Sequence, residues 1–146
     1  MKDQPVAVTL GDPAGIGPEI IARTFAEEDF YDENRAFVVG DAGILRRAVD
    51  LMGLPLGVNE VEKPEEALFE PYSVDVLPVG ELPENLPFGE LDARAGAAAF
   101  EYVRRATELA LEGSVGAIAT APLNKEAMHM GGYKYPGHTE ILAELT

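Results

Sequence analysis

Short apolar runs alternate with amphipathic stretches along this chain. Residues 6–10, VAVTL, form an apolar run of the length of a buried strand, and apolar residues from Pro18 onward recur at helical spacing. The unit then repeats, because residues 35–40 predict a second strand and Asp41 is a good N-cap for a helix that Gly53 ends. Parallel strands need crossover connections, which are usually helical. The pattern therefore predicts an α/β fold of three layers, with a mostly parallel sheet between helices.

The stretch from Leu54 to Leu91 differs from the rest because it is rich in proline and acidic residues. It contains one strand candidate at residues 73–79 and a second at residues 55–58. Pro78, Pro83 and Pro87 argue against a helix or a central strand. We therefore expect a loosely structured excursion over the surface.

Alanine dominates the apolar face of the longest predicted helix, which Asp92 caps and Gly113 ends. Because alanine side chains are small, this face predicts that a neighbouring element packs close to the helix. The uncharged residues 115–121 predict a buried parallel strand, and residues 123–130 predict a short helix. A last helix begins at residues 137–146 and lacks a C-cap, so we expect a truncated chain whose residues 1–146 form a single α/β region.

Charge narrows the classes of partner. The net charge is -15, which opposes binding to nucleic acid or to an anionic membrane surface. The chain has no cysteine and therefore no disulfide or thiolate metal site. No apolar run approaches the length of a membrane span or a signal peptide, so we expect a cytoplasmic protein.

A glycine-rich turn, GDPAGIGPEI at residues 11–20, follows the first predicted strand. It is not a dinucleotide fingerprint, because the third glycine position counted from Gly15 holds Ile20, and it is not a phosphate loop. Two interpretations remain: a tight strand-to-helix connection, or a turn that contacts a phosphate or a cofactor. Asp12 is the candidate site residue here, and it caps the helix, orients a ligand or is only solvated.

A second candidate site lies within residues 120–140, where both histidines fall. Lys125 follows the predicted strand 115–121 at its carboxyl end, where open α/β sheets bind ligands, and it offers positive charge to an anionic substrate. The alternative is an exposed helix lysine. His129 is interpreted as a partly exposed helix residue, and its spacing of nine residues from His138 predicts no metal pair.

His138 and Thr139 stand at the start of the last predicted helix, directly after Gly137. Imidazole, hydroxyl and unpaired backbone amides at a helix N-terminus suit a phosphate or a carboxylate, because the helix dipole favours negative charge there. The alternative is that Thr139 merely caps the helix. A capping box is absent, because Leu142 stands where a glutamate would be needed.

Three motifs in order, GDPAGIGPE, TAPLNK and YPGHTE, resemble the amino-terminal part of the 4-hydroxythreonine-4-phosphate dehydrogenase (PdxA) family. The resemblance runs over essentially the whole chain, while family members are considerably longer. It implies a fold similar to that of the isocitrate and isopropylmalate dehydrogenases, and an active site between domains and across a homodimer. It also implies that the substrate-binding His-Thr pair of the family falls on His138 and Thr139.

The resemblance implies an activity for the full-length parent: oxidation and decarboxylation of 4-phosphooxy-L-threonine in pyridoxal 5'-phosphate (vitamin B6) synthesis. The implied cofactors are NAD or NADP and a divalent metal, which is zinc, magnesium or cobalt. The metal-binding histidines of the family lie downstream of GHTE, so no metal ligand is expected in this chain. We expect this chain by itself to be inactive.

Three alternatives stay open at this point. The motifs do not separate the vitamin B6 enzyme from paralogues that oxidise 4-phospho-threonate or 4-phospho-erythronate, because they recognise the shared phosphorylated chain. A non-catalytic module that binds a phosphorylated metabolite is the second alternative. An acidic interaction domain without a small-molecule site is the third.

Overall fold

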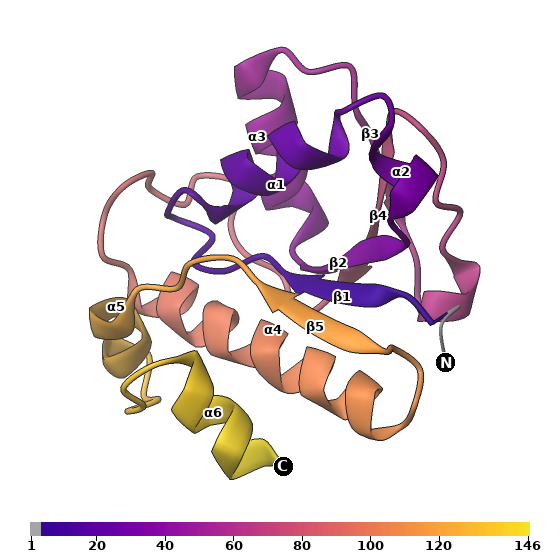
Figure 1. The fold of residues 1–146 in the computed structure, drawn as a ribbon. Helices are drawn as coiled ribbons and strands as arrows, with labels where there is room; N and C mark the ends of the chain where they lie inside the picture. The colour runs from indigo at the N-terminus through magenta and orange to yellow at the C-terminus, as the bar shows by residue number, and fades with distance from the viewer. Residues whose placement is uncertain (1–3) are drawn as a thin grey trace.

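Residues 4–146, which are the residues that the computed structural model describes, form a parallel five-stranded sheet between two helical layers (Figure 1). The spatial order is β3-β4-β2-β1-β5, and each neighbouring pair is parallel. The α/β prediction is confirmed. The strands are β1 (Val6–Thr9), β2 (Ala36–Gly40), β3 (Gly57–Glu60), β4 (Ser73–Pro78) and β5 (Ala117–Thr120).

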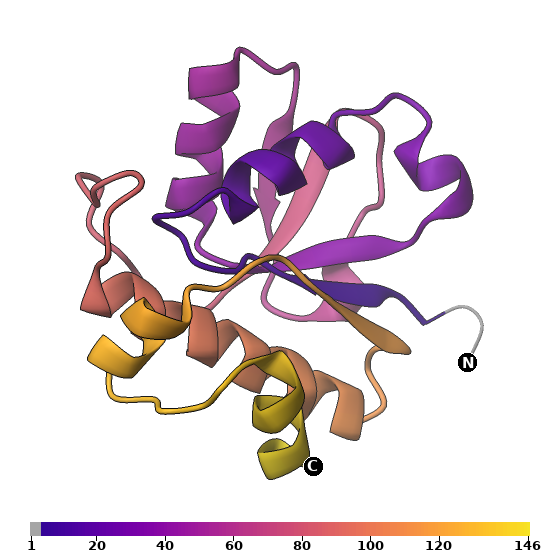
Figure 2. The ribbon, with the colours of Figure 1, turned by 60° about the vertical axis from the view of Figure 1, so that its left-hand side comes forward.

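The helices divide between the two faces of the sheet. One layer holds α1 and α3, and the other holds α4 with α5 and α6 packed on it (Figure 2). No helix within residues 4–146 has the length and apolar character that a membrane crossing needs. The helices are α1 (Gly17–Phe25), α2 (Phe30–Glu33), α3 (Ala42–Met52), α4 (Ala93–Leu111), α5 (Lys125–Met130) and α6 (His138–Leu145), with a short 3-10 turn at Pro64–Glu66.

Local capping chemistry explains where the longer helices begin and end. The Asp41 carboxylate accepts a hydrogen bond from the Ile44 amide at 2.9 Å, and Gly53 ends α3 in the left-handed region with φ of 62°. Asp92 accepts from the Arg94 amide at 2.8 Å and so begins α4. These three predictions from the sequence are confirmed.

The proline-rich stretch contains a central strand, so the expectation of a loose excursion there is wrong in part. β4 lies between β3 and β2, and most of its residues are buried. Pro78 is compatible with this position because it is the last residue of the strand, and the next amide, from Val79, donates to the Gly40 carbonyl at 2.9 Å. Pro83 and Pro87 lie in the loop between β4 and α4.

The predicted strand at residues 115–121 forms, but it is not buried. β5 pairs with β1 and occupies one edge of the sheet. Ala117, Ala119 and Thr120 are exposed. An uncharged run predicts a strand covered on both faces, whereas within this structure α4 covers β5 on one side.

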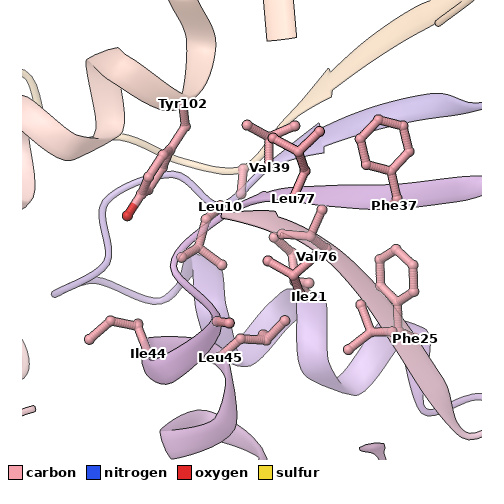
Figure 3. Packing of buried hydrophobic residues seen from close by; sticks show 14 of the residues in the cluster. Leu10, Ile21, Phe25, Phe37, Val39, Ile44, Leu45, Val76, Leu77 and Tyr102 are labelled. Atoms are coloured by element: carbon pink, nitrogen blue, oxygen red, sulfur yellow. The ribbon is translucent and has the colours of Figure 1, made fainter. Parts of the chain in front are cut away.

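The main core lies between the sheet and both helical layers. In Figure 3 the Tyr102 side chain comes from α4 on one side of the strands, and Ile44 and Leu45 come from α3 on the other. A second, smaller cluster joins α4, α5 and α6 through Phe100, Met128 and Ile141. The close packing expected of the alanine face is confirmed, because a Cβ on Gly96 of α4 would lie 1.9 Å from the Ala127 carbonyl oxygen of α5.

Candidate functional site

The glycine-rich turn connects β1 to α1 at the carboxyl end of the sheet, and two of its glycines serve close packing. A Cβ on Gly11, where φ is 74°, would lie 2.3 Å from the Pro122 carbonyl oxygen. A Cβ on Gly17 would lie 2.2 Å from the Leu10 carbonyl oxygen. Both positions therefore require glycine because the backbone approaches closely. This geometry favours the tight connection over a turn shaped around a phosphate.

Asp12 lies in this turn and borders a hollow of about 320 Å³. Its carboxylate accepts from the Ala14 amide at 2.8 Å, and its own amide donates to the Pro122 carbonyl at 2.9 Å. It does not cap α1, since Ile16 holds the N-cap position, so the capping interpretation is wrong. The hollow is also bordered by Glu90 and Asn124.

Burial governs the electrostatics of Asp12. The residue is 5% exposed, and this desolvation raises the pKa of its carboxyl group, helped by the negative charge of Asp92. The Arg94 guanidinium has the opposite effect on Asp92, and its hydrogen bond lowers the pKa of Asp92 to about 2. The hollow therefore has an acidic rim, which disfavours a phosphate group at this point.

Lys125 is the first residue of α5, where the Asn124 side chain caps the helix by accepting from the Ala127 amide at 2.9 Å. Lys125 is exposed, and no acidic side chain among residues 4–146 pairs with it within 4.0 Å. The Cε atom of Lys125 lies 3.7 Å from the point that a Cβ on Gly137 would occupy. The fold therefore brings this lysine to the N-terminus of α6, twelve positions further along the chain.

The N-terminus of α6 has unused hydrogen-bonding groups. Gly137 occupies the N-cap position and has no side chain that could cap the helix. The first helical hydrogen bond runs from the Ile141 amide to the Gly137 carbonyl, at 3.3 Å. The amides of residues 138–140 therefore have no acceptor inside the helix. The Thr139 hydroxyl is exposed and has no partner in the described part of the chain, so the interpretation of Thr139 as a mere cap is wrong.

His138 is half-buried, and its Nε2 is shielded from solvent. This nitrogen finds no hydrogen-bond partner among residues 4–146. Burial lowers the pKa of His138, which favours the neutral imidazole, in which one ring nitrogen donates and the other accepts. A buried nitrogen without a partner is costly, and a water molecule or a ligand oxygen would satisfy it.

The structure groups the predicted site residues in two places. Lys125, His138 and Thr139 gather at the N-terminus of α6, while Asp12 borders the hollow, and no hydrogen bond in the described structure joins it to His138. Sequence reasoning missed Glu140, whose Oε2 lies 3.6 Å from the point that a Cβ on Gly137 would occupy and brings a negative charge to the same helix end as Lys125. Volume alone does not identify a site, because a hollow of about 590 Å³ beside α3 has none of these residues on its walls.

Comparison with known proteins decides the family. The model of a family described as pyridoxal phosphate biosynthetic protein PdxA matches residues 32–146. The chain belongs to the PdxA family. Its resemblance to that family, based on three short motifs, is therefore confirmed over most of its length.

Relatives within the PdxA family are named for two related substrates. The D-threonate 4-phosphate dehydrogenase of Cupriavidus necator is 48% identical over 97% of this chain and 42% of its own length. A solved structure of a 4-hydroxythreonine-4-phosphate dehydrogenase from Klebsiella pneumoniae is 50% identical with a TM-score of 0.92, over 99% of this chain and 45% of that one. One from Burkholderia phymatum is 46% identical with a TM-score of 0.94, over 97% and 43%. The chain thus spans less than half the length of these relatives.

Proposed function

We propose that this chain is the part of a PdxA-type dehydrogenase that binds the phosphate end of a phosphorylated four-carbon hydroxy acid. In the whole protein, NAD or NADP would serve as the oxidant of the substrate's secondary alcohol and a divalent metal as a Lewis acid, and the β-keto acid formed would lose carbon dioxide. The proposal rests on the family and on the chemistry at the N-terminus of α6. The homodimer and the assignment of His138, Thr139, Asp12 and Lys125 to the active site belong to the same proposal.

The observation that supports the phosphate site most strongly is the set of unpartnered groups at one helix end. Three free amides, the Thr139 hydroxyl and the shielded His138 nitrogen lie in a single turn, and Lys125 adds a positive charge beside it. The dipole of α6 adds to this attraction for an anion. Glu140 opposes it, so the affinity of this chain alone for phosphate is expected to be weak.

Two substrates are compatible with this site, because both carry the same phosphate. D-Threonate 4-phosphate is favoured by the name of the Cupriavidus relative. 4-Phosphooxy-L-threonine, and with it vitamin B6 synthesis, is favoured by the names of the solved structures. We place D-threonate 4-phosphate first and keep 4-phosphooxy-L-threonine as the second candidate. Steady-state kcat/KM values of the full-length protein on both compounds decide between them.

The residues of this chain do not fit a complete metal or dinucleotide site. Within the described residues, no three His, Asp or Glu side chains converge as metal ligands. Gly11 and Gly17 pack against backbone carbonyl oxygens of the same chain, and the nearby hollow has an acidic rim. We therefore derive no catalytic step through the metal or the nicotinamide cofactor from these residues.

An NMR titration of the chain with inorganic phosphate tests the site. We expect the signals of His138 and Thr139 to shift, and Lys125→Met to weaken binding because it removes the adjacent positive charge. Lys134→Met is the matched control, since Lys134 is exposed in the neighbouring loop and the change in net charge is the same. Glu140→Gln is expected to tighten binding, because it removes the opposing carboxylate.

Three results would contradict the proposal. Shifts confined to residues around Lys63 or Arg104 would place the anion elsewhere on the surface. Equal losses from Lys125→Met and Lys134→Met would mean that phosphate responds only to net charge and not to a built site. Unchanged binding in a His138→Ala variant would favour an acidic interaction domain over a metabolite site.

A further inference from the structure

Backbone hydrogen bonds hold only the first part of the segment that leads to α6. Residues 131–137 connect α5 to α6, and Gly131 packs so closely that a Cβ on it would lie 2.6 Å from the Ala93 carbonyl oxygen of α4. The Tyr133 amide still donates to the Met128 carbonyl at 3.1 Å. Beyond that point, no backbone bond among the described residues joins residues 134–136 to another element. Side chains must therefore position the end of this segment.

Two tyrosines of the segment stack on one phenylalanine of α4. The Tyr133 ring lies nearly parallel to the Phe100 ring, with centroids 3.9 Å apart and an interplanar angle of 13°. The Tyr135 ring is also nearly parallel to Phe100, at 5.5 Å and 10°. Phe100 itself is 4% exposed, so it offers a fixed surface to both rings. We call Phe100, Tyr133 and Tyr135 the aromatic brace.

Polar contacts fix the brace at both tyrosines. The Tyr133 hydroxyl donates to Glu101 Oε1 at 2.8 Å, and the other oxygen of Glu101 accepts from Arg104 at 2.7 Å. At the other tyrosine, His129 Nε2 donates to the Tyr135 carbonyl at 2.8 Å. His129, which the sequence places as an unremarkable helix residue, thus ties α5 to the segment three positions before His138.

We propose that Tyr133 and Tyr135, stacked on Phe100, are positioning residues that set where the first turn of α6 lies and hence how His138 and Thr139 present themselves to phosphate. The part concerning phosphate rests on the proposed function. The brace fixes the segment immediately before Gly137, while Ile141 fixes the following turn by its complete burial against the same helix. The turn between these two anchors is therefore held on both sides.

The test measures the pKa of His138 by NMR in the 146-residue chain, together with its affinity for inorganic phosphate. Tyr135→Leu removes one stacked ring, and Tyr133→Phe removes one hydroxyl while it keeps the ring. In both variants we expect the pKa of His138 to rise toward its ordinary value, because its shielded nitrogen becomes hydrated, and we expect phosphate binding to weaken by about fivefold. Tyr135→Phe keeps the stack and is expected to restore both quantities.

Tyr31→Phe is the matched control, because the Tyr31 hydroxyl also makes one 2.8 Å hydrogen bond, to the carbonyl of Ser73, the first residue of β4. Tyr31→Phe is expected to lower stability about as much as Tyr133→Phe. It is expected to leave the pKa of His138 and the affinity for phosphate unchanged. An unchanged His138 pKa in Tyr135→Leu overturns the proposal, as does an equal change in Tyr31→Phe. If phosphate does not perturb His138 and Thr139 in the wild type, the proposed function fails, and the brace is still decided by the His138 pKa.

Discussion

Replacing Gly96 with alanine tests the close contact between α4 and α5, and it sets two effects against each other. Gly96 is a residue of the helix interior, where alanine is intrinsically preferred by about 1 kcal/mol. Its Cβ position, however, lies 1.9 Å from the Ala127 carbonyl oxygen and 2.4 Å from the Met128 nitrogen. Real Cβ atoms essentially never approach another heavy atom below 3.0 Å, so α5 would have to move by about 1 Å or more.

The packing term should exceed the helix preference. The obstructing atoms belong to a helix backbone, which cannot rotate aside as a flexible side chain can, so the cost lies near the upper end of overpacking, about 3 kcal/mol. Moving α5 also loosens Met128, which is fully buried against α4 and α6. After the gain in helix preference is subtracted, the free energy of unfolding should fall by about 2 kcal/mol, or roughly 4–8 °C in Tm.

Urea denaturation followed by circular dichroism measures this change. Gly43→Ala is the matched control, because Gly43 is an exposed glycine of α3 and its Cβ position meets only the Asp41 side chain, at 3.2 Å. We expect the control to remain within about 1 kcal/mol of the wild type. If Gly96→Ala proves neutral or stabilising, the two helices do not approach as closely as described, and the account of the alanine face is refuted.

Three further predictions concern single residues. Asp12→Asn should stabilise the protein at pH 7 and make its stability less dependent on pH, because asparagine keeps the acceptor for the Ala14 amide and carries no charge. Burial raises the pKa of Asp12 above its unfolded value of 3.8, so wild-type stability falls as the pH rises from that value through the folded pKa, which thermal melts across a pH series check. Ile141→Ala should lower the free energy of unfolding by about 2 kcal/mol or more and detach α6 from α4, which calorimetry measures. Phosphate should then no longer shift the Thr139 signal, and an unchanged shift would contradict the anchoring role of Ile141. Ala119→Lys should change stability by only about 0.5 kcal/mol because Ala119 is exposed, and a large loss in urea denaturation would mean that β5 is covered in solution.

The helices were predictable where the signal is local. Asp41, Asp92 and Gly53 act within a few residues of themselves, through a side-chain oxygen or a single backbone angle, so the sequence contains the whole cause. The sequence pattern understates β4, because the rule against proline in central strands depends on the position inside the strand. That position is set by pairing with β2, which the sequence pattern does not reveal.

The candidate site shows the same division between local and distant causes. The motif placed His138 and Thr139 at a helix start, and the structure agrees because glycine and proline act locally. Other features of the site depend on residues far apart in sequence. They are the burial of the His138 nitrogen, the approach of Lys125 to Gly137 and the stacking of Tyr133 on Phe100. The spacing of His129 from His138 predicts no metal pair, and the contact that His129 makes is to a backbone carbonyl, which periodicity does not report.

The two edges of the sheet show why an apolar run was predicted to be buried and is nevertheless exposed. At the β3 edge, Asn59 bonds to the Asp75 carboxylate and Glu60 pairs with Arg46, so polar side chains protect the open backbone. β5 has no charged residue and no proline in Ala117–Thr120, and it lacks this protection. Composition alone predicted a covered strand, because apolar side chains are retained where something packs on them. The rule about composition and the observed exposure are compatible if a group outside residues 4–146 covers β5.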